Sequence, residues 1–323
     1  MAIVTEAFRN TYQRQFEPEV QQRVSKLMGA VQVETGIDKV AGERHFIDFV
    51  GTRTMTQVEG RAGDSPHTAQ DYRRRAMTMT DYHDGIIHDS FDKFRLLEDP
   101  QSEVVMEQRT AAARKIDDVI IENMIGTAYG DHTGSTGYDW ATYGTDIPVH
   151  YNEALISGTT GATADLNLTV GKVRRTAELF RANDVDLEYE DMHFVIAGSQ
   201  LHALQVDDEW TSADYNAMKP LIDGKAPSSW MGFTWHVSNR LNTGLVSGYA
   251  EGDPADVTAR LCFAYARSVF KLGFALKPKV ILDPERIDKR GAPYSYISMT
   301  LGGVRKDEKR VLRVPCYESA ALY

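Results

Sequence analysis

One stretch restricts the fold more than any other: DPQSEVVMEQRTAAARKIDDVIIENMIG, residues 99–126, which predicts a single long helix. Asp99 suits the N-cap, Pro100 suits the first turn and Gly126 suits the C-cap. Apolar residues recur along one side of this helix: Val105, Ala112, Ile116, Val119, Ile120 and Met124. At 1.5 Å per residue the helix would be a rod of roughly 40 Å, which is long for a globular domain.

Residues 45–80 predict a long β-hairpin that protrudes from the body of the protein. FIDFVGTRTMTQV and YRRRAMTMTDY are rich in Thr, Val and Tyr with alternating character, and EGRAGDSPHTAQD between them is full of turn residues. Two thin strands with polar faces are barely stable alone, so we expect the hairpin to rest on another molecule. Residues 1–44 have few apolar anchors and predict an arm with one short helix within 17–31, bearing Val20, Val24, Leu27 and Val31.

The remainder of the chain predicts an α+β fold. Residues 127–166 are rich in Gly and Thr without a clean period, which indicates a long irregular insertion. Residues 167–183 predict a helix with Leu168, Val173, Ala177 and Phe180 on its buried side. Residues 191–208 predict a buried strand, a turn and a short helix in that order. Residues 260–274 predict an apolar β-rich segment, and residues 277–284 and 294–318 predict strands.

Composition excludes several classes of protein. The formal net charge of -10 disfavours binding of nucleic acid over a broad face, because phosphate contacts need a surplus of Lys and Arg. Cys262 and Cys316 lie far apart without zinc-site spacing, so we expect two buried free thiols in a reducing compartment. We see no signal peptide and no apolar stretch of about 18 residues, and we therefore expect a soluble protein made in a cytoplasm.

The segment MTMTDYHDGIIHDSFDKFRLLEDP, residues 77–100, is the only cluster that suggests chemistry. Its histidines, His83 and His88, are five residues apart, and neither a helix nor a strand directs both toward one metal ion. The segment therefore favours a polar strand, with Ile86–Ile87 as its buried spot, that leads into the long helix. The acidic run at 184–193 lacks EF-hand spacing and predicts a solvated loop. We predict no catalytic, cofactor-binding or metal site, and no enzyme.

Arginines gather on the predicted hairpin. The run Arg73–Arg75 has two interpretations: a solvated flank of a turn, or a basic cluster that pairs with an acidic surface of a neighbouring subunit and sets the register of the contact. The candidate inter-subunit contacts are Arg53, Arg61, Arg73, Arg74 and Arg75.

Four segments in a fixed order carry a resemblance to a known family. They are DYHDGIIHDSFDKFRLLEDP, AARKIDDVIIENMIGTAY, WTSADYNAMKPLIDGK with WMGFTWHVSNRL, and YSYISMTLGGVRKDEKRVLRVPC. Together they resemble the major capsid proteins of tailed double-stranded-DNA bacteriophages, which share the HK97-like shell fold. The resemblance implies these parts: an N-terminal arm at 1–44, an extended β-hairpin loop at 45–80, a peripheral domain at 81–165 with a spine helix at about 100–126, an axial domain at 166–274, and returning strands of the peripheral domain at 275–323.

The resemblance also implies a function. The chain would self-assemble into pentamers and hexamers that form an icosahedral head shell around the phage genome, without a cofactor, a membrane or sequence-specific DNA binding. Its partners would be its own copies, a separate scaffolding protein, a portal and, as a further candidate, a decoration or cement protein. The shell would assemble in the host bacterial cytoplasm and remain in the virion. The alternatives are an encapsulin-type nanocompartment, an enzyme that uses His83, Asp84 and His88, and a tail or portal component.

Overall fold

The computed structural model describes most of the chain. The described residues are 34–37, 42–51, 69–70, 72–87, 101–151, 166–207, 229–247, 256–286 and 292–318, with the single residues 40, 53, 55 and 57. The predicted arm helix within 17–31 and the segment 210–225 lie outside this set.

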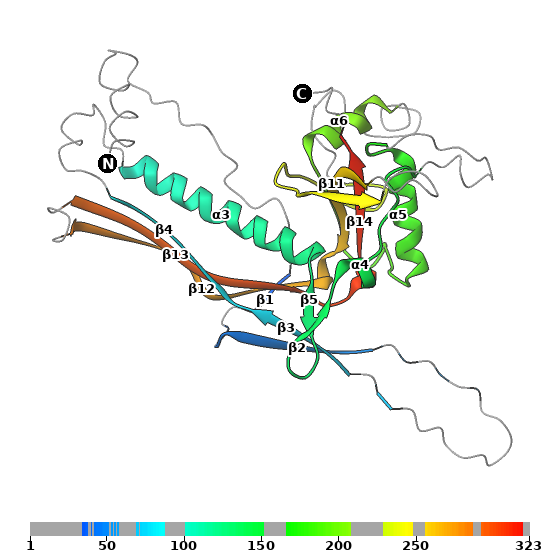
Figure 1. Ribbon diagram of the computed structural model, residues 1–323, viewed down its shortest axis with the longest axis horizontal. Helices are drawn as coiled ribbons and strands as arrows, with labels where there is room; N and C mark the ends of the chain where they lie inside the picture. Colours follow the sequence, from blue (N-terminus) through cyan, green and yellow to red (C-terminus); the bar gives the residue numbers. More distant parts are fainter. Residues whose placement is uncertain are drawn as a thin grey trace.

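The long helix is confirmed as α3, Gln101–Ile125, and it lies across one face of a four-stranded sheet (Figure 1). The order of strands in this sheet is β1 (Glu34–Ile37), β12 (Phe270–Arg286), β13 (Ala292–Arg305) and β4 (Thr80–Ile87). The backbone N–H of Gly126 donates to the Glu122 carbonyl at 2.9 Å and closes the last turn. The predicted cap residues Asp99 and Pro100 lie outside the described residues.

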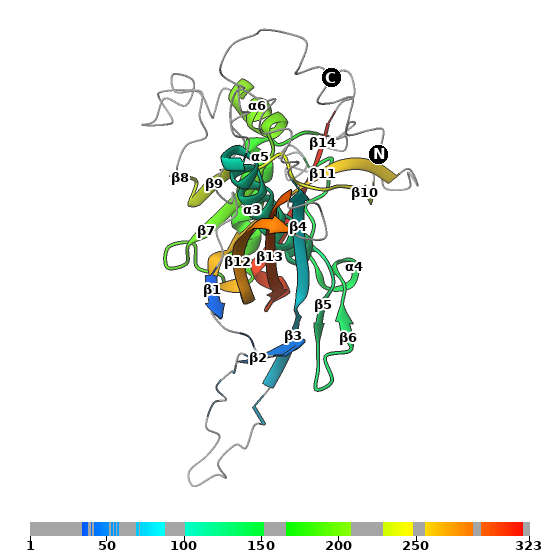
Figure 2. The same ribbon diagram turned by 90° about the vertical axis from the view of Figure 1, so that its left-hand side faces the viewer.

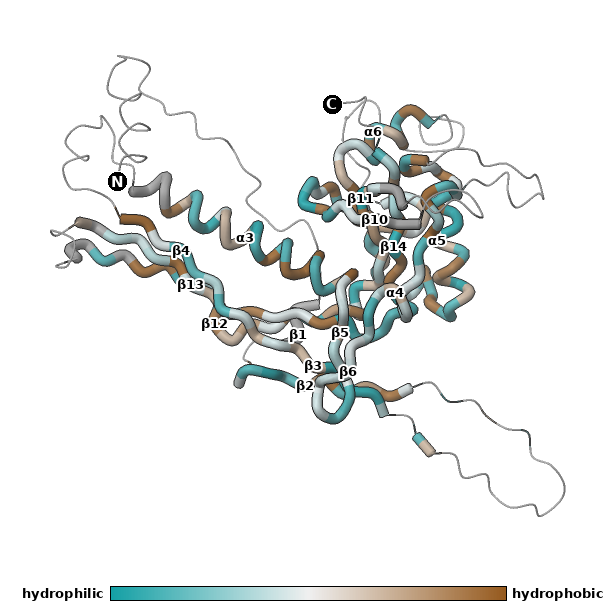
Figure 3. The backbone as a smooth tube through the Cα atoms, in the orientation of Figure 1, coloured by the Kyte–Doolittle hydropathy of each residue, from teal (hydrophilic) through white to brown (hydrophobic). Residues whose placement is uncertain are grey.

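The apolar stripe of α3 is buried against this sheet. Ala112, Val119, Ile120 and Met124 are buried, while Val105 and Ile116 are half-buried. Each fully buried aliphatic side chain contributes about 1.5–3 kcal/mol, so the stripe fixes the helix on the sheet. Hydrophobic and hydrophilic residues alternate along α3 in Figure 3. The helix also makes a polar contact, since the Ser295 hydroxyl donates to the side-chain oxygen of Gln108.

The predicted hairpin is confirmed at its base. β2 (Arg44–Val50) and β3 (Tyr72–Thr78) pair antiparallel. β5 (Ala128–Gly130) and β6 (Thr136–Tyr138) extend them into a second four-stranded sheet, in the order β2-β3-β5-β6. Figure 2 shows this sheet projecting away from α3.

The prediction of an irregular insertion at 127–166 was wrong for its first part. Residues 128–143 form β5, β6 and the short helix α4 (Trp140–Tyr143). Strands of three residues carry too few positions for an alternating pattern, and β5 is specified by its pairing with β3 instead. Residues 152–165 lie outside the described residues.

A six-stranded sheet lies beyond the C-terminal end of α3 (Figure 1). Its path is β10 (Thr243–Ser247), β11 (Asp256–Ala266), β7 (Met192–Ile196), β9 (Phe233–Val237) and β8 (Ser229–Trp230), with β14 (Val311–Tyr317) paired to β11. The remaining helices of the described residues are α5 (Val170–Ala182), α6 (Gly198–Val206) and the short helices η2 (Arg267–Val269) and η4 (Glu308–Arg310).

The predicted helix at 167–183 and the strand–turn–helix at 191–208 are confirmed as α5, β7 and α6. All four residues predicted on the buried side of α5 are buried: Leu168, Val173, Ala177 and Phe180. The Phe180 ring lies 6.2 Å from that of Phe233, which in turn meets Phe194 edge-on at 5.6 Å. These rings join α5 to the sheet in one aromatic core.

The C-terminal strand β14 is fastened into this sheet by a polar network at its end. Arg260 donates two hydrogen bonds to the Glu318 carboxylate, and Ser199 and Gln200 donate to the same group. Burial raises the pKa of Glu318, but these hydrogen bonds lower it further, to about 2. The thiols of Cys262 and Cys316 are buried and free on the paired strands β11 and β14, as predicted.

Candidate assembly interface

The hairpin is seated on the long sheet through two glycines. Gly273 and Gly302 face each other across β12 and β13. A Cβ atom on Gly302 would lie 2.3 Å from the Thr78 carbonyl oxygen, and one on Gly273 would lie 2.6 Å from the Met77 Cε. Met77 is fully buried beside Val304 in a small core. β3 therefore crosses the sheet in close contact, and at Gly302, where the obstacle is backbone, only glycine leaves room. We call Gly273 and Gly302 the glycine seat.

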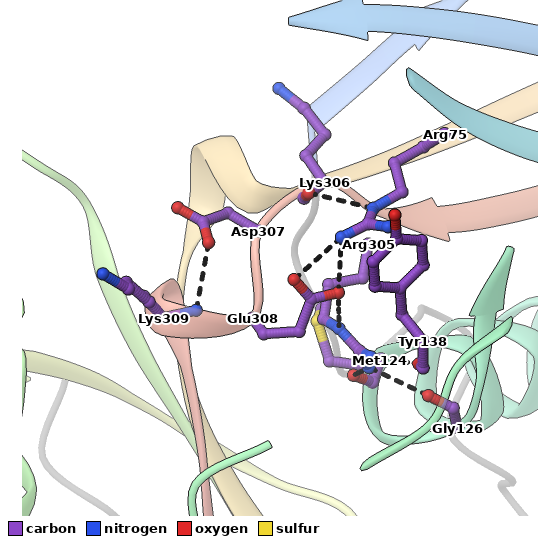
Figure 4. Close-up of polar contacts among 9 residues, drawn as sticks. All are labelled: Arg75, Met124, Gly126, Tyr138, Arg305, Lys306, Asp307, Glu308 and Lys309. Carbon is purple, nitrogen blue, oxygen red and sulfur yellow. Dashed lines mark hydrogen bonds and ion pairs between the residues drawn. The ribbon is translucent and has the colours of Figure 1, made fainter. Parts of the chain in front are cut away.

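A buried charge cluster holds the hairpin beside this seat (Figure 4). The Arg75 Nη2 on β3 donates to both carboxylate oxygens of Glu308 at 2.8 Å, and its Nε donates to the Lys306 carbonyl. The guanidinium also lies 3.8 Å from the centroid of the Tyr138 ring. Arg75 is 3% exposed, so this ion pair is desolvated and strengthened by the low local dielectric.

A second arginine completes the cluster. Arg305, at the end of β13, is fully buried, and its Nη1 donates to the carbonyls of Met124 and Gly126 at the C-terminus of α3. A cation is favoured at a helix C-terminus, where carbonyls lack helical partners. Burial lowers the pKa of Arg305, and the charge of Glu308 opposes that shift. We call Arg75, Arg305 and Glu308 the hairpin clamp, since it joins β3 to the end of α3.

One face of the hairpin sheet carries large exposed apolar side chains. By their register, Phe46, Val50, Tyr72 and Tyr129 lie on the same face, and they are 38, 59, 75 and 49% exposed. We call these four residues the exposed hairpin face. Between them lies the exposed pair of Arg74 and Asp48, whose Nε and Oδ1 are 2.5 Å apart. Exposed apolar side chains gathered on one face, with a charge pair between them, are typical of a protein contact.

The structure separates the predicted arginines from one another. Arg53 and Arg73 are exposed on the hairpin, and Arg61 lies outside the described residues. Arg74 is exposed with Asp48 as its partner in the same chain. Arg75 instead points into the hairpin clamp, where its charge is used within the subunit. Contact with a neighbouring subunit stays a prediction for Arg53, Arg61, Arg73 and Arg74, whereas the burial of Arg75 within its own subunit disfavours it there.

The histidine and aspartate stretch does not form a site in the described residues. His83 and Asp84 are adjacent on β4, opposite Ser298 and Ile297, and so face opposite sides of the sheet. His88 and Asp89 lie outside the described residues. The described parts of the chain contain no group of three or more His, Cys, Asp or Glu arranged to hold a metal ion.

The prediction that Ile86–Ile87 forms a buried spot was wrong. Ile86 is 39% and Ile87 45% exposed, because β4 is an edge strand of the long sheet. Within the described residues, no helix is long and apolar enough to cross a membrane.

Sequence reasoning missed Glu308 and Arg305, which lie far from Arg75 along the chain. One signal for Arg75 was available: it is two residues from Met77, so the two side chains share a face of β3, and the face of Met77 is buried. A basic residue on a buried face requires an acidic or carbonyl partner.

Comparison with solved structures identifies the architecture. The chain is similar to the capsid structure of the cyanophage P-SCSP1u, at 15% identity and a TM-score of 0.68, over 96% of this chain and 94% of that one. It is also similar to the mature capsid of bacteriophage PhiM1, at 12% identity and a TM-score of 0.65, over 94% and 91% of the two chains. A third similar structure is the cyanophage Pam1 capsid, at 14% identity and a TM-score of 0.61, over 96% and 98%.

A long helix on an extended sheet, a projecting hairpin and a second sheet domain thus define the HK97-like fold. A family model for the phage capsid protein matches residues 4–318, whereas a search of curated protein sequences found no match. The chain belongs to the phage capsid protein family and is a major capsid protein of the head shell of a tailed phage.

Proposed function

We propose that copies of this chain join as pentamers and hexamers and close an icosahedral shell around a double-stranded DNA genome. The observation that carries the proposal is the exposed hairpin face, on a sheet that projects from the body of the subunit (Figure 2). An isolated subunit leaves this surface in water, and a neighbouring subunit would bury it. Because the contact repeats around closed rings, each copy of it can be weak while the shell is stable.

Charge supports the same arrangement. The chain has a formal net charge of -10, yet the described hairpin presents Arg53, Arg73 and Arg74 at its surface. Residues 45–80 carry five Arg against four Asp and Glu, so the hairpin segment is close to neutral on an acidic chain, and its exposed arginines are complementary to an acidic surface of a second copy. We therefore propose that Arg53, Arg61, Arg73 and Arg74 steer the hairpin toward an acidic surface of its neighbour.

The layout of the subunit follows from this proposal. Residues 1–44 form an arm, 45–80 the loop that contacts a neighbour, 81–165 and 275–323 the peripheral domain, and 166–274 the axial domain around the centre of each ring. β14 contributes to both parts, since it follows β13 in the chain but pairs with β11.

The proposed partners are a separate scaffolding protein, a portal and a decoration or cement protein. The shell encloses DNA without reading its sequence, performs no chemistry and assembles in the host bacterial cytoplasm. The acidic charge of the chain supports a wall that repels DNA and does not adsorb it.

Electron microscopy of the full-length protein from phage lysate, with the absorbance ratio at 260 and 280 nm on the same fraction, tests the proposal. We expect uniform icosahedral particles whose absorbance ratio reports packaged nucleic acid. Uniform shells filled with protein would support an encapsulin-type nanocompartment instead. A chain that stays a monomer or dimer, alone and with the other phage proteins, would refute the proposal.

A further inference from the structure

The hairpin clamp contains two buried arginines but only one carboxylate. Arg75 is 3% and Arg305 0% exposed, while Glu308 is 9% exposed. Arg75 belongs to the hairpin, whereas Arg305 and Glu308 lie on either side of the turn between β13 and β14. Figure 4 shows Glu308 placed between the two guanidinium groups. The carboxylate therefore has two possible partners on two different parts of the molecule.

The two arginines share the carboxylate unequally. Both oxygens of Glu308 accept from Arg75 at 2.8 Å. The Nε of Arg305 is 3.7 Å from the nearer oxygen, which is longer than a hydrogen bond. This Nε is buried and has no hydrogen-bond partner among the described residues. A buried donor without a partner is rare, and here it points at a carboxylate that is engaged elsewhere.

A small movement exchanges these partners. A shift of Glu308 by about 1 Å brings its oxygen to the usual distance of a charge-assisted hydrogen bond with Arg305 Nε. If Arg75 withdrew from a carboxylate with no second partner, a buried charge would remain uncompensated, which is strongly destabilising. Arg305 removes that obstacle, because it is already in place and held by the carbonyls of Met124 and Gly126.

We propose that Glu308 is a positioning residue with two states, in which it either holds the hairpin through Arg75 or, when the hairpin changes direction, transfers to Arg305 at the end of α3. This inference rests on the proposed function, since a shell places its subunits in more than one environment and the hairpin must fit each of them. The exchange couples the direction of the hairpin to the C-terminus of the long helix, because Arg305 contacts both Glu308 and the last turn of α3.

Amide hydrogen exchange, measured on the full-length unassembled subunit, tests whether Glu308 changes its partner from Arg75 to Arg305. The variants are Arg75→Gln, Glu308→Gln and both together, and the readout is the exchange rate of the amides at 122–126. With Arg75 present, Glu308→Gln leaves the buried Arg75 without its carboxylate, so we expect its main effect on the amides of β3 and a change of less than about threefold at 122–126. In the Arg75→Gln background Glu308 bonds Arg305, so Glu308→Gln then accelerates exchange about tenfold, the loss of one charge-assisted hydrogen bond. An equal effect in both backgrounds would overturn the proposal.

Arg74→Gln is the matched control. Arg74 lies next to Arg75 on β3, but its partner is the exposed Asp48. We expect Arg74→Gln to leave the hydrogen-exchange rates at 122–126 unchanged. In the Arg74→Gln background, Glu308→Gln should change these rates by less than about threefold, as it does in the unmodified chain. If Arg74→Gln changed the effect of Glu308→Gln on hydrogen exchange as Arg75→Gln does, the effect would come from loss of hairpin charge. The proposed change of partner would then be wrong.

A crystal structure of the Arg75→Gln subunit gives an independent answer that does not need the double variant to fold. We expect a Glu308 oxygen within about 3 Å of Arg305 Nε. A carboxylate that turns to solvent, or stays beyond 3.5 Å, overturns the inference. Shell formation is measured separately. If shells form but Glu308 does not change its partner, only this inference is overturned. If Glu308 changes its partner but no shells form, only the proposed function is refuted.

Discussion

Gly302→Ala should loosen the hairpin without touching its exposed surface. The new Cβ would lie 2.3 Å from the Thr78 carbonyl oxygen, whereas a carbon–oxygen contact needs about 3.3 Å. The obstacle is backbone, so β3 must move by about 1 Å relative to β13. Overpacking of this kind costs about 1–3 kcal/mol. At 1.4 kcal/mol per factor of ten, a cost of about 2 kcal/mol accelerates hydrogen exchange about 30-fold.

The assay is hydrogen exchange of the β3 amides, residues 72–78, in the full-length unassembled subunit. Gly198→Ala is the control, because its Cβ would meet only the Asn239 Oδ1 at 3.4 Å, an ordinary contact, and alanine is favoured over glycine in the helix α6. We expect the control to leave β3 unchanged. If Gly302→Ala changed β3 exchange less than about twofold, the glycine seat would not position the hairpin.

Three further predictions test other parts of the subunit. Glu318→Gln should destabilise β14 at neutral pH. Because the pKa of Glu318 in the folded state, about 2, is below its usual value of 4.5, the loss of stability relative to the unmodified chain is full above pH 4.5 and disappears as the pH falls toward 2. Thermal unfolding of both chains across this pH range measures it. Phe180→Ala should lower the free energy of unfolding by about 3–5 kcal/mol in denaturant titrations, whereas Tyr189→Ala, at an 88% exposed site, should change it by less than about 0.5 kcal/mol. Val50→Asp and Tyr72→Asp should leave the subunit folded by circular dichroism but abolish particles in electron micrographs, and Tyr189→Asp should still give particles.

The helices were predictable because their signals are local. The spacing of Val119, Ile120 and Met124 specifies one buried side of α3, and Phe180 with Val173 does the same for α5. The alternation of β2 and β3 around turn residues likewise located the hairpin. The longest of these patterns, the hairpin at 45–80, is complete within 36 residues of sequence.

The assembly of these elements around the hairpin was not predictable from local patterns. The hairpin clamp joins Arg75 to Glu308, which is 233 positions away, and the glycine seat places Gly302 on Thr78. β5 has three residues and depends on β3 for its pairing. Ile86 and Ile87 were predicted as buried from their hydrophobicity, but the position of β4 at the edge of the sheet leaves them exposed.

The most direct test of the account is a cryo-electron-microscopy reconstruction of the assembled particle, with the exposed area of each residue compared between the single subunit and the shell. We predict that Phe46, Val50, Tyr72 and Tyr129 lose most of their exposed area against another copy of the chain. Particles in which this face remains in solvent, or in which the hairpin folds back onto its own subunit, would contradict it.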